Sequence, residues 1–285
     1  DDILTILLAG LFWAGFSGML SVWIFYPLAL WLAAQFARPT ATLGSPAKTV
    51  TILIAAHNEE HNIISRLDNI YVVGSADFQF SVLIAIDHSS DRTEPLVREY
   101  CAAHPEREIR FFNSEGRGKA AAHNQAMTRI NSDLVLFTDA DTIFEPGFID
   151  TIGHVFFFLY VGFCSGELSW RGRSTPQGAS SFPIYWRFEL FLRRLESRLG
   201  ICTAGTGACC AMRPELFVPL HATSDTDCST PLDVVQQGYA CTVEPRARAM
   251  DFVADTVAGE FKARVRMTSK NLRNTLSSWR WRESA

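Results

Sequence analysis

The sequence predicts an α/β fold in which a doubly wound mixed sheet follows an N-terminal transmembrane helix. An uncharged run extends from Ile3 to Phe36. After it, apolar β-branched runs alternate with helical segments, and polar residues stand where each run ends. Alternation of this kind is typical of a sheet covered by helices, with one shared cleft at the carboxyl ends of its strands. The 285 residues are enough for one large domain plus a membrane element.

The amino-acid composition limits the classes of protein to which this chain can belong. Charged residues make up 20% of the chain and the formal net charge is −4, which gives no support for nucleic-acid binding. The seven cysteines form no CxxC motif, and their odd number fits a reducing compartment. We therefore expect buried apolar cysteines rather than disulfides or zinc ligands.

The N-terminal run is longer than the about 20 apolar residues that span a bilayer. Trp13, Trp31 and other aromatic residues spread along it suit membrane interfaces, and Pro27 is expected to kink or split it. One spanning helix is the main prediction; a re-entrant or interfacial pair and a buried hairpin of a soluble protein are the alternatives. Arg38 and Lys48 follow the run, so the globular part is expected on the cytoplasmic side of the cell (inner) membrane.

Three strands are expected in the first half of the domain. A linker covers residues 37–48, and apolar runs at 49–56, 80–86 and 109–112 predict the strands. Each run leads into polar residues and a helix. Asn58 is expected to cap the first helix, and the second helix is expected over 94–103.

The most informative stretch is residues 135–143, VLFTDADTI. Its apolar part predicts a buried parallel strand, and Asp139 and Asp141 follow at the carboxyl end. Alternation along an extended chain would aim both carboxylates the same way, and hard oxygen donors suit Mg²⁺ or Mn²⁺. An Asp-rich turn that caps the next helix is the alternative.

The third strand leads into a glycine-flanked helix start at 116–119. The glycines permit close approach to a phosphate, and Lys119 adds positive charge. Neither GxGxxG nor a Walker A motif occurs in the sequence, which disfavours a dinucleotide-binding Rossmann enzyme and a P-loop protein.

Four short sequences, in this order, resemble family 2 glycosyltransferases of the GT-A fold. They are AAHNEE at 55–60, DHSSDRT at 87–93, GKAAAHN at 118–124 and DAD at 139–141. The resemblance covers roughly residues 49–275. It implies a GT-A type, Rossmann-like sheet in a membrane-anchored enzyme of the bacterial polysaccharide or lipid-linked glycan type, with a UDP-type nucleotide-sugar donor.

The resemblance also assigns roles to individual residues. Ala55, Glu59 and Asp87 would line the nucleoside pocket, with Asp87 on the base, and Lys119 would lie near the donor phosphates. Asp139 and Asp141 would hold the metal, and this pair would also touch the ribose. Relatives often carry paired acids at the second motif, whereas this chain has Ile86 before Asp87 and His88 after it. His88 is interpreted as a surface-loop residue.

The second half of the domain is expected to bind the acceptor. A dense aromatic strand is predicted over 156–164, and an amphipathic helix over 180–198 that faces either the core or the membrane surface. The small residues of 203–213 suggest a wall approached closely by a ligand, or a tight turn. By resemblance, Gly207 and Ala208 lie on the acceptor side.

Asp227 stands where the family carries its general base at a helix start. Thr226 departs from the family's acidic pair, and Asp225 is the alternative base. An acceptor hydroxyl is a poor nucleophile, so a carboxylate within hydrogen-bond reach can take its proton. In-line attack would invert the anomeric centre. Asp227 is otherwise interpreted as an N-cap.

Residues 260–267 stand where processive relatives carry QxxRW, but the required Gln and Trp are missing. Arg264 or Arg266 could reach the diphosphate, and Arg266 is the residue predicted to bind it. The missing motif argues against a long-chain polymer synthase. Trp279 and Trp281 among arginines indicate an interfacial tail over 276–285.

The predicted organisation is therefore a membrane anchor at 3–36, a linker at 37–48, a nucleotide-sugar-binding half at 49–145, an acceptor-binding half at 146–275 and the tail. The predicted partners are a nucleotide-sugar donor, a glycan or lipid-linked acceptor and the membrane.

Two other functions stay open. A sugar-1-phosphate nucleotidyltransferase would want a glycine-rich basic loop after the first strand, where this chain has AAHNEE. A degenerate nucleotide-sugar binder would fit the departures at Ile86 and Thr226.

Overall fold

One mixed sheet of eight strands organises the domain in the part of the chain that the structure describes. The computed structural model describes residues 2–37, 43–44, 47–172, 183–222, 224–253, 265 and 268–269. The strand order is β3-β2-β1-β4-β7-β6-β8-β5. The strands are β1 (Thr49–Ala56), β2 (Gln79–Ile86), β3 (Ile109–Asn113), β4 (Leu134–Thr138), β5 (Ile143–Phe144), β6 (Val161–Gly172), β7 (Cys210–Met212) and β8 (Ala240–Val253).

The first four strands are parallel, and β1 lies between β2 and β4. Strands β1, β2 and β4 are almost wholly buried, as expected for parallel strands covered on both faces. The second half of the sheet is mixed. Strand β7 joins it antiparallel to β4, and β6 and β8 run parallel to each other beyond β7.

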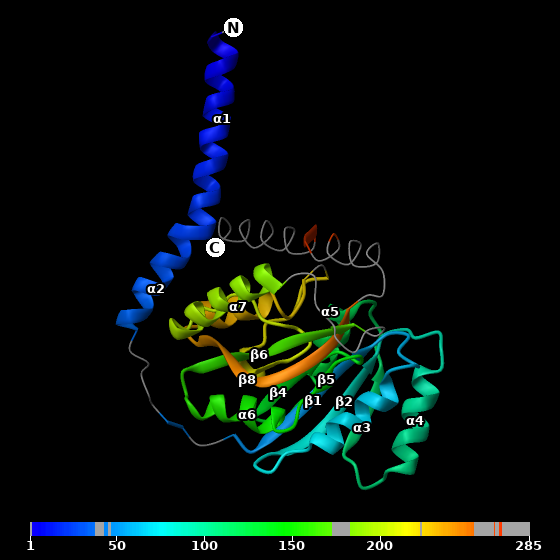
Figure 1. Cartoon of the computed structure of the whole chain (residues 1–285). Coiled ribbons are helices and arrows are strands. Elements are labelled where there is room, and N and C mark those ends of the chain that lie inside the picture. Colours follow the sequence, from blue (N-terminus) through cyan, green and yellow to red (C-terminus); the bar gives the residue numbers. More distant parts are fainter. Residues whose placement is uncertain are drawn as a thin grey trace.

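Helices cover both faces of this sheet, so the doubly wound α/β class is confirmed (Figure 1). The helices α3, α4 and α6 pack on one face around Ile52 and Ile54, while α5 and α8 pack on the other around Leu53. Their bounds are α3 (Ile63–Val73), α4 (Thr93–Ala103), α5 (Lys119–Met127), α6 (Phe148–His154) and α8 (Ser229–Gln236).

The N-terminal run forms one continuous helix that projects from the domain (Figure 1). It consists of α1 (Asp2–Leu20), a π-helical turn (Ser21–Phe25) and α2 (Tyr26–Phe36). The wider π turn ends two residues before Pro27, which lacks an N–H and crowds the preceding turn, so the expected kink has a physical cause. By length and composition, the 34 residues from Ile3 to Phe36 are a candidate membrane span.

The lower part of this helix packs against α7 (Pro183–Arg198). Trp23 stacks on Phe188 with ring centroids 4.6 Å apart, and the Tyr26 hydroxyl donates to Glu196 at 2.6 Å. Pro27 and Leu30 are buried on α2. The apolar helix is thus attached directly to the second half of the domain.

Two local predictions were wrong. The run 156–164 is not one strand: a 3-10 helix covers Val155–Phe157, Leu159 is exposed, and β6 begins only at Val161. A run of consecutive aromatic residues carries no period that separates helix from strand. Asn58 caps no helix, because α3 begins at Ile63; Asn58 instead adopts a left-handed conformation with φ 56°.

We expect Leu53→Ala to lower the free energy of unfolding by about 2–5 kcal/mol, because Leu53 is fully buried in the middle of β1. Val72→Ala is the control, since Val72 is 84% exposed, and should change stability by less than about 0.5 kcal/mol. Denaturant titration of both variants in detergent measures the difference. Equal stabilities would show that the packing around β1 is not the core.

Candidate functional site

The loops after β1, β2, β3 and β4 meet at one edge of the sheet, because parallel strands end on the same side. Ala56 pairs with Ile86, and Ile86 pairs with Asn113, so the first three strands end level with one another. Strand β4 ends at Thr138, paired with Ile54. Asp87 and Asp139, each one residue past its strand, are therefore brought to this edge, as the sequence predicted.

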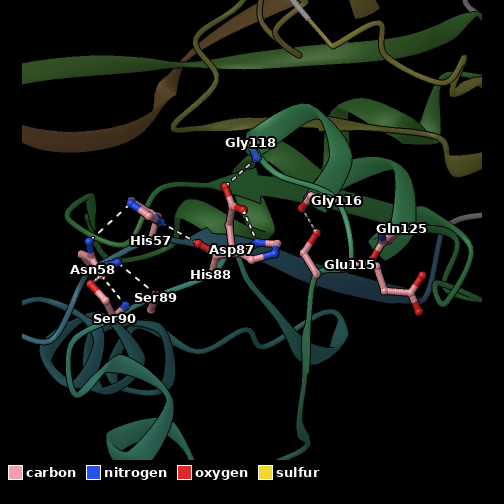
Figure 2. Close-up of polar contacts among 11 residues, drawn as sticks. His57, Asn58, Asp87, His88, Ser89, Ser90, Glu115, Gly116, Gly118 and Gln125 are labelled. Carbon is pink, nitrogen blue, oxygen red and sulfur yellow. Dashed lines mark hydrogen bonds and ion pairs between the residues drawn. The ribbon is translucent and has the colours of Figure 1, made fainter.

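The loops after β1 and β2 are joined by hydrogen bonds between backbone and side chains (Figure 2). The Asn58 N–H donates to Ser89 Oγ at 3.1 Å, and the Ser90 N–H donates to Asn58 Oδ1 at 2.8 Å. The Glu59 N–H donates to Thr93 Oγ1 at 2.7 Å. Asn58 adopts the left-handed conformation, which Asn tolerates. In this conformation it fixes the two loops to each other.

A hollow of about 320 Å³ opens beside these loops, lined by His57, Asp87, His88, Arg117 and Gly118. Asp87 is held from several sides (Figure 2). Its Oδ2 accepts from the Gly118 N–H at 2.8 Å, its Oδ1 lies 3.2 Å from His88 Nδ1, and its carbonyl accepts from His57 Nδ1 at 2.5 Å. Ala55, near the end of β1, and Glu59 lie outside this lining. The contacts with Gly118 and His88 fix the direction of the Asp87 carboxylate in the hollow.

Lys119 and Asp139 form an ion pair at the centre of the edge. Lys119 is the first residue of α5, after Gly118 with φ 91°. Burial alone would raise the pKa of Asp139, but the neighbouring Lys119 ammonium holds that pKa below its usual value. Burial opposes the charge of Lys119 in turn, but Asp139, then Asp227 and Asp225, raise the pKa of Lys119 above its usual value. The two groups therefore stay charged together.

Asp141 lies in the turn after β4 rather than on an extended strand. The expected alternation of side chains along a strand therefore does not set the directions of the Asp139 and Asp141 carboxylates. Its charge nonetheless acts on the same neighbours as that of Asp139. Burial raises the pKa of Glu59, and Asp141 and Asp139 raise it further. Three carboxylates thus interact at this edge.

The donor set fits a hard divalent cation. In the described residues there is no group of three or more His, Cys, Asp or Glu side chains placed to bind a metal. Two carboxylates suffice for Mg²⁺, which keeps several waters and shares substrate phosphates as ligands. Two carboxylates at one turn, with their charge only partly offset by Lys119, match that requirement.

Arg66 lies beneath the pair, and sequence analysis missed it. Its side chain is almost fully buried on α3, donates to Thr138 Oγ1 at 2.8 Å and to Asn69 Oδ1 at 2.6 Å, and stacks over Phe144 at 3.9 Å. Burial lowers the pKa of Arg66 to about 9, and Asp139 and Asp141 oppose the shift. At neutral pH it supplies a positive charge below the carboxylates.

Asp227 approaches the same centre from the second half of the chain. It precedes α8, whose N-cap is Cys228, so Asp227 is not the N-cap. Its carbonyl accepts from the Gly205 N–H at 2.8 Å. A methyl group at Gly207 would lie 3.9 Å from Asp227 Oδ2, so the two residues are direct neighbours. Burial and then Asp225 raise the pKa of Asp227, while Lys119 opposes the rise.

The segment that contains Gly207 and Ala208 is attached to α7. Arg193 Nη1 donates to Thr206 Oγ1 at 3.1 Å and to the Gly205 carbonyl at 3.4 Å. Ala208 itself is buried. The structure thus brings Gly207, but not the side chain of Ala208, to the surface of the site near Asp227. Arg264, Arg266 and the tail 276–285 lie outside the described residues.

His123 is a second buried polar residue at this site. It is fully buried on α5, and its ring lies against Phe137 with centroids 5.1 Å apart. Burial, followed by the Lys119 ammonium, lowers the pKa of His123 to about 3. The imidazole is therefore neutral in the folded protein over the physiological range.

Comparison with known proteins gives a consistent match. A family model described as glycosyl transferase family 2 matches residues 51–217, more than half of the chain. Poly-beta-1,6-N-acetyl-D-glucosamine synthase of Staphylococcus aureus strain COL is 27% identical over 226 residues, which are 76% of this chain and 53% of that protein. Dolichyl-phosphate beta-glucosyltransferase of Drosophila melanogaster is 29% identical over 104 residues, 34% of this chain and 32% of that protein. The chain spans about half the length of the curated synthase it matches.

Among solved structures, a mannosyltransferase of Pyrobaculum calidifontis in complex with GDP-mannose and Mn²⁺ superposes with a TM-score of 0.71. It is 22% identical, and the match covers 92% of this chain and 74% of that one. At this identity the likeness supports the shared fold.

The buried His123 predicts that stability falls as the medium becomes acid. Its pKa is about 3 in the folded protein and 6.5 for an exposed histidine, so the unfolded chain binds the extra proton between these limits. The contribution is fully present above pH 6.5 and is lost as the pH falls toward 3. At pH 5 the stability lost through His123 amounts to about 2 kcal/mol.

Denaturant titrations at pH 7.5 and pH 5 should therefore show a smaller loss of stability for His123→Leu than for the unmodified protein. The difference between these two losses isolates the effect of His123 from that of the carboxylates, which titrate in both proteins. Equal losses of stability would mean that His123 is protonated in the folded state.

Proposed function

We propose a function that follows from one premise: this chain belongs to glycosyl transferase family 2. It transfers a sugar from a nucleotide-diphosphate sugar, preferably a UDP-sugar, to a glycan or lipid-linked acceptor. The transfer inverts the anomeric centre. Asp227 acts as the general base, and Asp139 and Asp141 hold a divalent metal ion. Family membership removes the nucleotidyltransferase alternative. The observation that carries the proposal is the place of Lys119, paired with Asp139 and within the electrostatic reach of Asp227.

The donor lies along the carboxyl edge of the sheet. Asp87 accepts from the base in the hollow lined by His57, His88 and Arg117. Ala55 and Glu59, assigned to the nucleoside by resemblance, lie outside that lining. Lys119 reaches the phosphates, because its ammonium already lies among the carboxylates of the centre. Arg266, which lies outside the described residues, is the second positive group proposed for the diphosphate. In the proposed binding mode, the anomeric carbon lies between the phosphates and Asp227.

Asp139 and Asp141 would hold the metal ion, which when bound offsets charge on the departing diphosphate. The base step belongs to the chain itself. Burial and Asp225 raise the pKa of Asp227, which makes it a stronger base than an exposed aspartate. Gly207 leaves room beside the carboxylate for the acceptor hydroxyl. Asp225, on the same turn, is the alternative base.

The N-terminal helix anchors this enzyme in the membrane. At about 1.5 Å per residue, 34 residues reach about 51 Å, while the hydrocarbon core is about 30 Å thick. Spanning with the whole helix would need a tilt of about 54°, above the usual range of about 0–40°. The 19 residues of α1 match the core, at about 28 Å, so α2 lies at the interface beside α7.

Asp227→Asn should retain donor binding and lose transfer by at least about 100-fold, because the amide cannot take the acceptor proton. Asp233→Asn is the matched control, a half-buried acid on the adjacent α8 whose pKa burial also raises. Sugar transfer and calorimetric donor binding measure the two effects. Unimpaired transfer by Asp227→Asn would refute the assignment of the base and favour Asp225 or a degenerate site.

Asp141→Ala should abolish the increase in donor affinity that Mn²⁺ provides, because one of two metal ligands is lost. Asp77→Ala, on the loop before β2 at the opposite edge of the sheet, should keep that increase. Calorimetric titration of the nucleotide with and without Mn²⁺ gives both values. An unchanged Mn²⁺ effect in Asp141→Ala would place the metal elsewhere.

Membrane anchoring predicts that the protein stays in the pellet after alkaline carbonate extraction of membranes. A cytoplasmic domain also predicts that the domain is digested by protease added to inverted inner-membrane vesicles and protected in intact spheroplasts. Release into the carbonate supernatant would contradict the anchor, and the reverse protease pattern would contradict the orientation.

A further inference from the structure

We propose that His123 and Asn124, adjacent residues of α5, position Asp227 for proton transfer by holding the segment that leads to it. Both are positioning residues, because they act through Leu220 and Thr226 rather than on the substrate. The inference rests on the proposed role of Asp227 as general base.

Asn124 holds the beginning of this segment through two hydrogen bonds. Its Nδ2 donates to the Leu220 carbonyl at 2.8 Å, and its Oδ1 accepts from the Leu220 N–H at 2.8 Å. A side-chain amide that pairs with both backbone groups of one residue fixes the position and the direction of the chain there. Leu220 is buried, so the contact is shielded from water.

His123 holds the end of the segment. Its Nδ1 lies 3.2 Å from Thr226 Oγ1, and Thr226 immediately precedes Asp227. Both side chains are at most 1% exposed. The other ring nitrogen, Nε2, is buried with no hydrogen-bond partner in the described part of the chain. An apolar residue would fill this space without an unpaired nitrogen, so the contact with Thr226 is what the imidazole supplies.

The state of this contact does not change near neutral pH, because burial keeps the imidazole neutral. A neutral ring has one donor and one acceptor nitrogen, and a threonine hydroxyl can match either role. The hydrogen bond therefore works as a fixed support rather than as a proton relay.

Helix α5 links this support to the donor side. Lys119 and His123 are four residues apart and thus lie on the same face of the helix. Lys119 pairs with Asp139, while His123 contacts Thr226. One short helix consequently sets the separation between the proposed metal ligand and the proposed base. The Gly205 N–H also donates a hydrogen bond to the Asp227 carbonyl at 2.8 Å.

The test is Thr226→Val, which keeps the shape of the side chain and removes the hydroxyl. We expect kcat for sugar transfer to fall about 10- to 100-fold, since a displacement of about 1 Å is enough for such a loss. The Kd and the KM of the donor should stay within about twofold. Thr230→Val is the matched control: Thr230 is equally buried on α8, and its hydroxyl has no hydrogen-bond partner in the described residues. It should keep kcat within about twofold.

The double variant Thr226→Val with Asp227→Asn separates positioning from general destabilisation. If Thr226 acts only through Asp227, the double variant should transfer no more slowly than Asp227→Asn alone. A further loss in the double variant, or an unchanged kcat in Thr226→Val, would overturn the proposal. Normal transfer by Asp227→Asn itself would instead refute the proposed base.

Asn124→Ala provides the second variant, measured in the same two backgrounds. It removes both hydrogen bonds to Leu220 without changing Thr226. If Thr226→Val fails to fold or to bind donor, a selective loss of kcat in Asn124→Ala that vanishes in the Asp227→Asn background supports the proposal. An additive loss in that background contradicts it.

Discussion

The ion pair between Lys119 and Asp139 is the interaction on which the rest of the site depends. Glu59, Asp139, Asp141, Asp225 and Asp227 bring acidic charge to one edge of the sheet, and Lys119 and Arg66 are the positive groups that act on it. Like charges gathered in a partly dry space repel one another, so each cation permits more than one carboxylate to stay ionised. A nucleotide diphosphate would add further negative charge. Under the proposed function, a divalent ion would offset this charge together with Lys119.

The candidate membrane helix is connected to the proposed acceptor side by direct packing. Helix α2 packs on α7 through Trp23 and Tyr26, and Arg193 of α7 holds the segment that contains Gly207. That segment touches Asp227. The side of the site proposed for the acceptor is therefore the side attached to the apolar helix, which suits an acceptor that is made or carried at the membrane surface. Figure 1 shows this arrangement, with α7 between the helix and the sheet.

The sequence predicted the first half of the fold well, because each strand there is a β-branched apolar run that ends in polar residues. Strand β1 has the predicted bounds, and β2 begins one residue earlier than predicted. The sequence could not show that β7 lies beside β4, or that β6 and β8 are parallel, because those pairings join distant segments. Three consecutive phenylalanines gave a false strand. Arg66 and His123 went unnoticed for a related reason: a polar residue on a helix is normally exposed, and only tertiary neighbours such as Thr138 and Thr226 reveal that these two are buried.

The central claim is that this charge arrangement is a metal-dependent nucleotide-sugar site. Its most direct test is calorimetric titration of UDP, GDP and ADP into the detergent-solubilised protein, with and without Mn²⁺. We expect one nucleotide, preferably UDP, to bind with a Kd that is at least about tenfold lower when Mn²⁺ is present. Absence of binding by all three nucleotides in the presence of Mn²⁺ would contradict it.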